Sequence, residues 1–268
     1  MCTIIVRHGI DNWCTTLVAA NRDEFYDREA TSPTVLSEDP RVVGGRDDSK
    51  GGTWFGVTDQ GVFVGLTNQR NFGWPDGSLK SRGELVLRAL ETGSHRGIIA
   101  FLERTDPRLY NEFNLVFGDG TSLAVAYGRR SEDRVEVQPL DPGVHVLCND
   151  RLGSPEFPKA VTARERVLSI GPEPWGVLKN ELAEILSDET LPDPSEVPPI
   201  PDNALFDQEL ARHLQALCVR TPVYGTVSAT LAAVRPGRVE QYHYVSTDPA
   251  SGAFDDYTAL AQGQRVSA

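Results

Sequence analysis

The chain has few of the residues that would cross-link it or hold a metal. Its 268 residues include four widely spaced cysteines with no CxxC pair, and five histidines that form no HExxH or comparable pattern. This spacing predicts reduced thiols rather than a disulfide framework, and it indicates no protein-bound metal. We therefore expect neither a disulfide-stabilised secreted protein nor a metalloenzyme.

Long apolar runs and an excess of positive charge are also absent. No run approaches the ~18–20 apolar residues that span a bilayer, and the start, MCTIIVRHGIDNW, lacks the features of a signal peptide. The 26 basic and 38 acidic residues give a net charge of −12, and only four of the basic residues are lysines. Because phosphate binding needs clustered positive charge, nucleic acid is an improbable partner. We expect a cytoplasmic protein without a membrane span, and the oligomeric state is left open.

Strand and helix patterns follow one another in blocks. Strand-like alternation covers residues 3–7, 14–20, 51–70, 114–148, 223–234 and 238–245. Helical spacing covers 82–104, with a break near 93–94, and also 160–169, 176–187 and 207–217. The polar residues 22–48 are predicted to form a long connection. Blocks of this kind predict an α+β fold with sheets and helices in separate layers. The length fits a single domain over residues 1–268, with a Pro-rich surface loop at about 191–202.

Cys2 is a candidate nucleophile because of its position. Methionine is normally removed when the next residue is small, and Cys2 would then carry both a thiol and a free α-amine. The amine, with a pKa of roughly 7.7–8.0, can accept the proton that the thiol must lose. The alternative is that Cys2 simply begins a buried strand, as small apolar cysteines often do.

The segment AANRDEF follows the returning strand of the first hairpin. Pairing in that hairpin would bring Asn21, Arg22 and Asp23 close to the chain start. Asp23 could bind and orient the α-ammonium, and Arg22 could favour the thiolate or hold an anionic substrate group. Asn21 is a further candidate for substrate binding. A salt bridge and turn at the end of a strand is the structural alternative.

Two other strand ends carry side-chain amides. Asn68 in GLTNQR and Asn149 in VLCND could donate hydrogen bonds to a developing oxyanion, although asparagine also ends strands for local reasons. Trp54 is a candidate pocket-lining side chain, with a core position as the alternative. The glycine-rich GGRDDSKGGTW is no P-loop, because it lacks GxxxxGK[ST] and no helix follows it.

Taken together, these motifs resemble one family. MCT, AANRDEF, GGRD, GGTWFGV, GLTNQR, VLCNDRLGSP and YGTVSAT, in this order, look like the NRDE family, also called the transport and Golgi organisation protein 2 family. That family is similar to cysteine N-terminal-nucleophile (Ntn) hydrolases such as penicillin V acylase. The resemblance covers nearly the whole chain and implies a four-layer αββα sandwich.

The resemblance also implies roles for individual residues. Cys2 would be the nucleophile and Asp23 the partner of its α-amine, while Asn68 and Asn149 would form the oxyanion site and position the amine. Two departures stand out. Arg22 is adjacent to Asp23, whereas the acylases place an arginine a few residues earlier, and Val227 stands where the family commonly has an arginine.

Two functions follow as hypotheses. The first is a hydrolase of linear amide C–N bonds in small molecules, which needs no cofactor. The second is a non-catalytic carrier of the same fold for haem or a lipid-like ligand, because relatives have been linked to haem trafficking and lipid homeostasis. A structural or partner-binding protein is a weaker third reading, since the sequence shows no repeat, coiled coil or basic patch.

Overall fold

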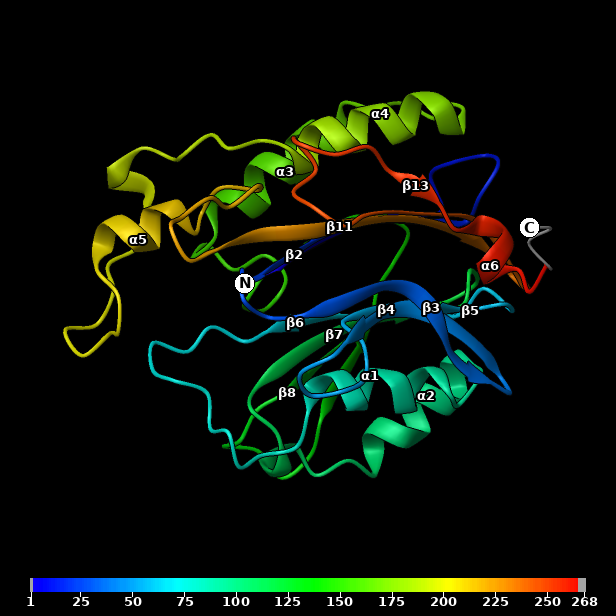
Figure 1. Ribbon diagram of the computed structural model, residues 1–268, viewed down its shortest axis with the longest axis horizontal. Helices are drawn as coiled ribbons and strands as arrows, with labels where there is room; N and C mark the ends of the chain where they lie inside the picture. The colour runs from blue at the N-terminus through cyan, green and yellow to red at the C-terminus, as the bar shows by residue number, and fades with distance from the viewer. Residues whose placement is uncertain (1, 265–268) are drawn as a thin grey trace.

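The structure is a computed structural model that describes residues 2–264. The fold has four layers (Figure 1). Two antiparallel sheets form the two middle layers. In spatial order, the six-stranded sheet contains β10 (Gly143–Leu147), β1 (Thr3–His8), β2 (Thr16–Phe25), β11 (Tyr224–Arg235), β12 (Arg238–Val245) and β13 (Asp255–Asp256). The seven-stranded sheet contains β3 (Ala30–Glu38), β4 (Arg41–Asp47), β5 (Phe55–Thr58), β6 (Phe63–Asn68), β7 (Phe113–Gly118), β8 (Leu123–Gly128) and β9 (Glu136–Pro139).

Helices cover the outer faces of both sheets (Figure 1). The pair α3 (Pro158–Leu168) and α4 (Trp175–Leu186) packs on the six-stranded sheet, and the pair α1 (Arg82–Leu90) and α2 (His95–Glu103) lies on the other. The shorter helices are η1 (Pro107–Leu109), η2 (Pro194–Glu196), α5 (Gln208–His213) and α6 (Thr258–Ala261). The predicted αββα arrangement is confirmed. Of the helices that the structure describes, none combines the length and hydropathy needed to cross a bilayer.

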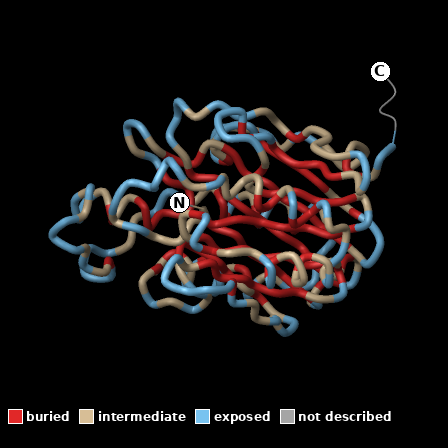
Figure 2. The backbone as a smooth tube through the Cα atoms, turned by 90° about the horizontal axis from the view of Figure 1, so that it is seen from below, coloured by how far each residue is buried: buried red, intermediate tan, exposed pale blue. Residues whose placement is uncertain are grey.

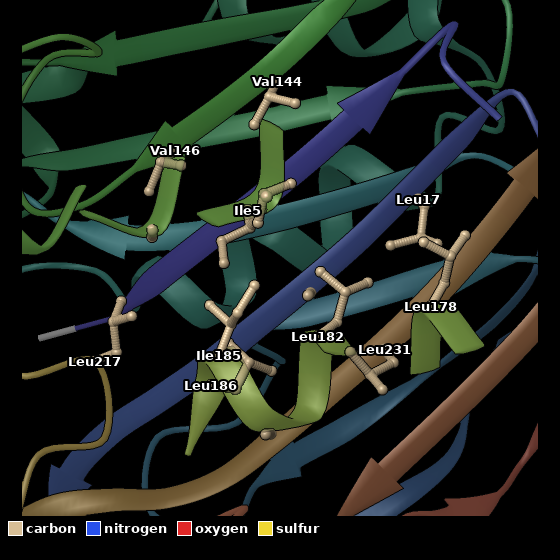
Figure 3. Close-up of a cluster of buried hydrophobic side chains, with 14 of the residues drawn as sticks. Ile5, Leu17, Val144, Val146, Leu178, Leu182, Ile185, Leu186, Leu217 and Leu231 are labelled. Carbon is tan, nitrogen blue, oxygen red and sulfur yellow. The ribbon is translucent and has the colours of Figure 1, made fainter. Parts of the chain in front are cut away.

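Three apolar layers hold the sandwich together, and β1 contributes to two of them. Ile5 packs toward α3 and α4 with partners such as Leu182 (Figure 3), whereas Ile4 and Val6 pack between the sheets. This follows from the period-two alternation of a strand that is buried on both faces. The tube in Figure 2 shows buried segments through the middle of the molecule and exposed segments around its outside. By the same alternation, Cys2 shares the inter-sheet side of Ile4.

The prediction of a long connection over residues 22–48 is wrong, because this stretch continues β2 and then forms β3 and β4. The β3 strand lies at the edge of its sheet, where half-exposed polar residues and Pro33 are tolerated and weaken the strand pattern. Gly44 is opposite Gly56 within the sheet, and a Cβ on Gly44 would lie 2.5 Å from the carbonyl oxygen of Phe55. These glycines therefore permit close packing of strands rather than turns.

Candidate active site

A cleft of about 170 Å³ opens at the end of the sandwich where the chain begins. Cys2 lines it just before β1, together with Arg22 and Asp23 from β2. The seven-stranded sheet contributes Trp54, which precedes β5, and Asn68, the last residue of β6. Both sheets therefore supply polar groups to the cleft, and five of the residues proposed from the sequence lie together in it.

Strand register explains why Cys2 has polar neighbours. Thr3 pairs with Asn21 on β2, and Ile4 pairs with Leu147 on β10. Continued to the position of Cys2, these registers place Arg22 on one side and Asn149 on the other. Cys2 is half-buried at the cleft wall, so its sulfur is not sealed in an apolar interior.

The surroundings of the Cys2 thiol favour its neutral form. Burial raises the pKa of Cys2 above its usual value, while a hydrogen bond from the backbone amide of Asp23 acts in the opposite direction. Attack by this sulfur therefore requires a base to accept its proton. Cys14 and Cys218 lie in the core, where burial raises the pKa of each thiol to about 12. The predicted removal of Met1 concerns a residue outside those described.

Asp23 is almost completely buried and is held by residues of the YGTVSAT motif. Its Oδ1 accepts a hydrogen bond of 2.7 Å from Thr226 Oγ1, and its carbonyl oxygen accepts one of 2.8 Å from Tyr224. Thr226 Oγ1 is in turn oriented by the backbone amide of Val219 at 2.8 Å. Burial raises the pKa of Asp23, and the charge of Lys159 partly offsets this effect. The hydrogen bonds thus fix the position of the Asp23 carboxyl group, and burial disfavours its ionised form.

Lys159 is a buried cation that the sequence did not single out. It lies in the first turn of α3 and is 3% exposed. Its Nζ donates to the carbonyl oxygens of Leu214 at 3.0 Å and Ala216 at 3.4 Å. A lysine at a helix start usually points into solvent, so no local signal identifies this one. Its charge favours the ionised form of Asp23.

We expect Asp23→Asn to raise the melting temperature at pH 7 while lowering any activity of the site. Folding raises the pKa of Asp23, so the native state binds more protons than the unfolded state. Its contribution to stability therefore falls as the pH rises above the unfolded value of about 3.9 and through the native pKa. Asparagine has nearly the same shape as aspartate but carries no charge, so it removes the cost of burying the carboxylate. Thermal melts at pH 4 and pH 7 measure the effect, and a lower melting temperature at pH 7 would contradict it.

Arg22 is 6% exposed and its guanidinium lies over the ring of Trp54, 4.2 Å from the ring centre. Within residues 2–264 no carboxylate forms an ion pair with it. The opposite strand, β11, has a bulge between Thr226 and Ser228, so Val227 has no paired residue on β2. Val227 is half-buried and uncharged, so this part of β11 supplies no cation. Arg22 is the cation that the strand register places next to the Cys2 thiol.

The three asparagines proposed from the sequence have different positions. Asn68 lines the cleft, whereas Asn149 is not among the lining residues. Asn149 Nδ2 donates to the carbonyl oxygen of Asn68 at 2.6 Å, and its buried Oδ1 has no hydrogen-bond partner in the described part of the chain. The side chain of Asn21 points toward the helix layer and donates to Leu186 and Leu217 at 2.8 and 2.9 Å. Asn149 thus holds the Asn68 backbone, and Asn21 holds the framework behind the cleft.

Sequence analysis missed several charged residues of the cleft. Arg82 begins α1 after the N-cap Ser81, and its charge interacts with Cys2. Arg28 pairs with Asp47 at 2.6 Å. The remaining unexpected lining residues include Glu24, Lys50, Asp76 and Lys80. Glu24 and Arg28 come from the segment predicted to be a connection, and no element was predicted at Lys50 or over residues 71–81. Charged residues in such segments normally indicate only solvent exposure.

Comparison with known proteins adds to this geometry. The model of the family described as "Transport and Golgi organisation 2" matches residues 1–245. The chain belongs to this family. Homologues of transport and Golgi organisation protein 2 from Homo sapiens and Mus musculus are each 32% identical to it, over 238 and 240 residues, and cover 81% of both chains. The family resemblance drawn from the motifs is confirmed.

Solved structures show the same fold at low sequence identity. A Caenorhabditis elegans orthologue of N-acylethanolamine-hydrolyzing acid amidase has a TM-score of 0.57 and 16% identity, covering 87% of this chain and 92% of that one. Penicillin V acylase from Agrobacterium tumefaciens also has a TM-score of 0.57, with 12% identity and coverage of 98% and 88%. Both support the assignment of this family member to the Ntn-hydrolase fold.

Proposed function

We propose that this protein hydrolyses a linear amide C–N bond in a small molecule, with Cys2 as the nucleophile. The observation that supports this most directly is the position of Cys2 on the wall of a cleft that also contains Asp23 and Asn68. The two structural neighbours are named for amidase and acylase activity, and the same reaction class is proposed here. The proposed site of action is the cytoplasm.

In the proposed reaction the α-amine of Cys2 takes the thiol proton as the sulfur attacks the substrate carbonyl. The Asn68 side chain donates a hydrogen bond to the oxyanion of the tetrahedral intermediate. The α-ammonium then protonates the leaving amine, the C–N bond breaks, and a thioester remains on Cys2. Water attacks the thioester, which releases the carboxylic acid and restores the thiol. Asp23 orients the α-ammonium group, and this role would account for an ionisable carboxyl group at a buried position.

Mass spectrometry can test this proposal in two steps. Intact mass should show that the purified protein begins with Cys2. A β-lactone acyl probe should then add to the N-terminal peptide of the native chain, and Cys2→Ala should abolish this adduct. Cys218→Ala is the matched control, because it removes a buried thiol outside the cleft and should leave labelling unchanged. Retention of Met1, or equal labelling of the Cys2→Ala variant, would refute the proposal.

The second candidate is a carrier of haem or a lipid-like molecule. In the described lining of the cleft, Cys2 is the only thiol and there is no imidazole, so Cys2 is the residue suited to bind haem iron. Leu66, Trp54 and Pro75 give the cleft an apolar component. Titration with haem should then produce a Soret shift that Cys2→Ala removes. An unchanged shift in that variant would exclude ligation by Cys2.

A further inference from the structure

Four basic side chains lining the cleft form no ion pair with a carboxylate in residues 2–264: Arg22, Lys50, Lys80 and Arg82. Four acidic side chains also line the cleft: Asp23, Glu24, Asp47 and Asp76. Asp47 pairs with Arg28 at 2.6 Å, and Asp76 accepts hydrogen bonds from the backbone and side chain of Ser78. With Arg28, the lining has five cations against four carboxylates, a small positive excess on a protein whose net charge is −12.

Two of these cations are partly or fully removed from solvent. Arg22 is 6% exposed and stacks on Trp54, and Arg82 is half-buried and donates to the carbonyl oxygen of Glu112 at 3.1 Å. Burial lowers the pKa of Arg82, and the charge of Glu24 partly offsets this effect. A buried cation without a counter-ion is costly, and an anionic group on a ligand removes that cost. Guanidinium groups also match the planar, bidentate geometry of carboxylate and phosphate.

The lysines mark the outer part of the same cleft. The whole chain has four lysines, and two of them, Lys50 and Lys80, line this cleft and are exposed. The start of α1 also lines the cleft, with Ser81, Arg82 and Gly83. Positive charge therefore extends from the buried Arg22 next to Cys2 to the exposed mouth.

We propose that the substrate carries an anionic group, a carboxylate or a phosphate, and that Lys50, Lys80 and Arg82 bind it. The exposed lysines hold this group at the mouth, and Arg22 lies beside the reacting carbonyl at Cys2. The inference rests on the proposed function only for the identity of the reacting residue. The binding of the anion itself does not require turnover.

A pair of alkylating reagents tests the charge preference at Cys2. Iodoacetate and iodoacetamide both form a bond to the thiolate as iodide leaves, but only iodoacetate is an anion. The rate of Cys2 alkylation by iodoacetate, divided by the rate with iodoacetamide, should be about tenfold higher in the native protein than in the urea-unfolded chain. The net charge of −12 acts in the opposite direction, so a raised ratio identifies local cations.

Variants locate the cations responsible. Lys50→Gln with Lys80→Gln, and separately Arg82→Gln, should lower this ratio several-fold. Lys179→Gln is the control for loss of a lysine charge, because Lys179 lies on α4 beside His243, away from the cleft, and it should leave the ratio unchanged. A native ratio equal to the unfolded one, or an equal effect of Lys179→Gln, would overturn the inference.

Binding to Cys2→Ala provides a second measurement that does not depend on thiol reactivity. Calorimetric titration with N-dodecanoylglycine, N-dodecanoyl-phosphoethanolamine and neutral N-dodecanoylethanolamine compares one acyl chain with three end groups. At least one anionic ligand should bind about tenfold more tightly than the neutral one, and the stronger of the two identifies carboxylate or phosphate. Equal affinity for all three, or no binding, would overturn the inference. Anion preference without amide hydrolysis would refute only the proposed function.

Discussion

A chain that carries one extra glycine before Cys2 should lose amide hydrolysis by about 10²–10⁴-fold, the usual contribution of a general base. The added residue moves the terminal amine about 3.8 Å along the chain and converts the amine of Cys2 into an amide that cannot accept a proton. The thiol and the rest of the cleft remain. The second-order rate of Cys2 acylation by the β-lactone probe measures the effect.

The matched control is the same chain made with a removable leader that a protease cleaves directly before Cys2. It passes through the same purification and ends with the authentic terminus, so it should have full activity. Circular dichroism should show the same fold for both chains. Equal acylation rates for the two would mean that the amine is not the base, and another group beside Cys2 would have to take that role.

Arg7→Met should destabilise the fold by about 3–5 kcal/mol, because it leaves a buried carboxylate without its partner. Arg7 is 1% exposed and forms two hydrogen bonds to Asp11, at 2.8 and 3.0 Å. It also donates to the carbonyl oxygens of Val167, Ile170 and Gly171 at the end of α3, at 3.0–3.1 Å. Urea unfolding monitored by tryptophan fluorescence measures the loss.

The double variant Arg7→Met, Asp11→Leu should recover part of this stability. It removes the uncompensated charge but leaves the three carbonyl groups at the end of α3 without their donor. Arg88→Met is the surface control, since the Arg88–Glu84 pair at 2.7 Å is largely exposed and should contribute less than about 1 kcal/mol. A loss of similar size for Arg7→Met and Arg88→Met would contradict the assignment.

Much of the fold could be predicted because its elements have local signals. The hairpin of β1 and β2 alternates clearly, and Ser81 and Ser94 cap α1 and α2 as expected for helix starts. The strands β3 and β4 gave no such signal: β3 keeps the polar residues of an edge strand, and the glycines of β4 serve a close packing that only the neighbouring strand explains. Their existence depends on the tertiary structure.

Residues that one hairpin brings together could be predicted from strand pairing, and Trp54 and Asn68 were proposed from their motifs, whereas other residues near the site carry no such signal. Cys2, Arg22 and Asp23 follow from the first hairpin, since pairing of neighbouring strands brings them together. Lys159 and Arg82 approach the site from helices on opposite outer layers, so only the complete sandwich places them there. The roles assigned to Asp23, Asn68 and Asn149 remain predictions.

Gly45 affects the cleft although it is not one of its lining residues. A Cβ on Gly45 would overlap the six-membered ring of Trp54, on which the Arg22 guanidinium rests. Any larger residue there would tilt the indole and shift the cation above it. A substitution at this backbone position, behind the Trp54 ring, can therefore reshape the cleft without any change in the residues that line it.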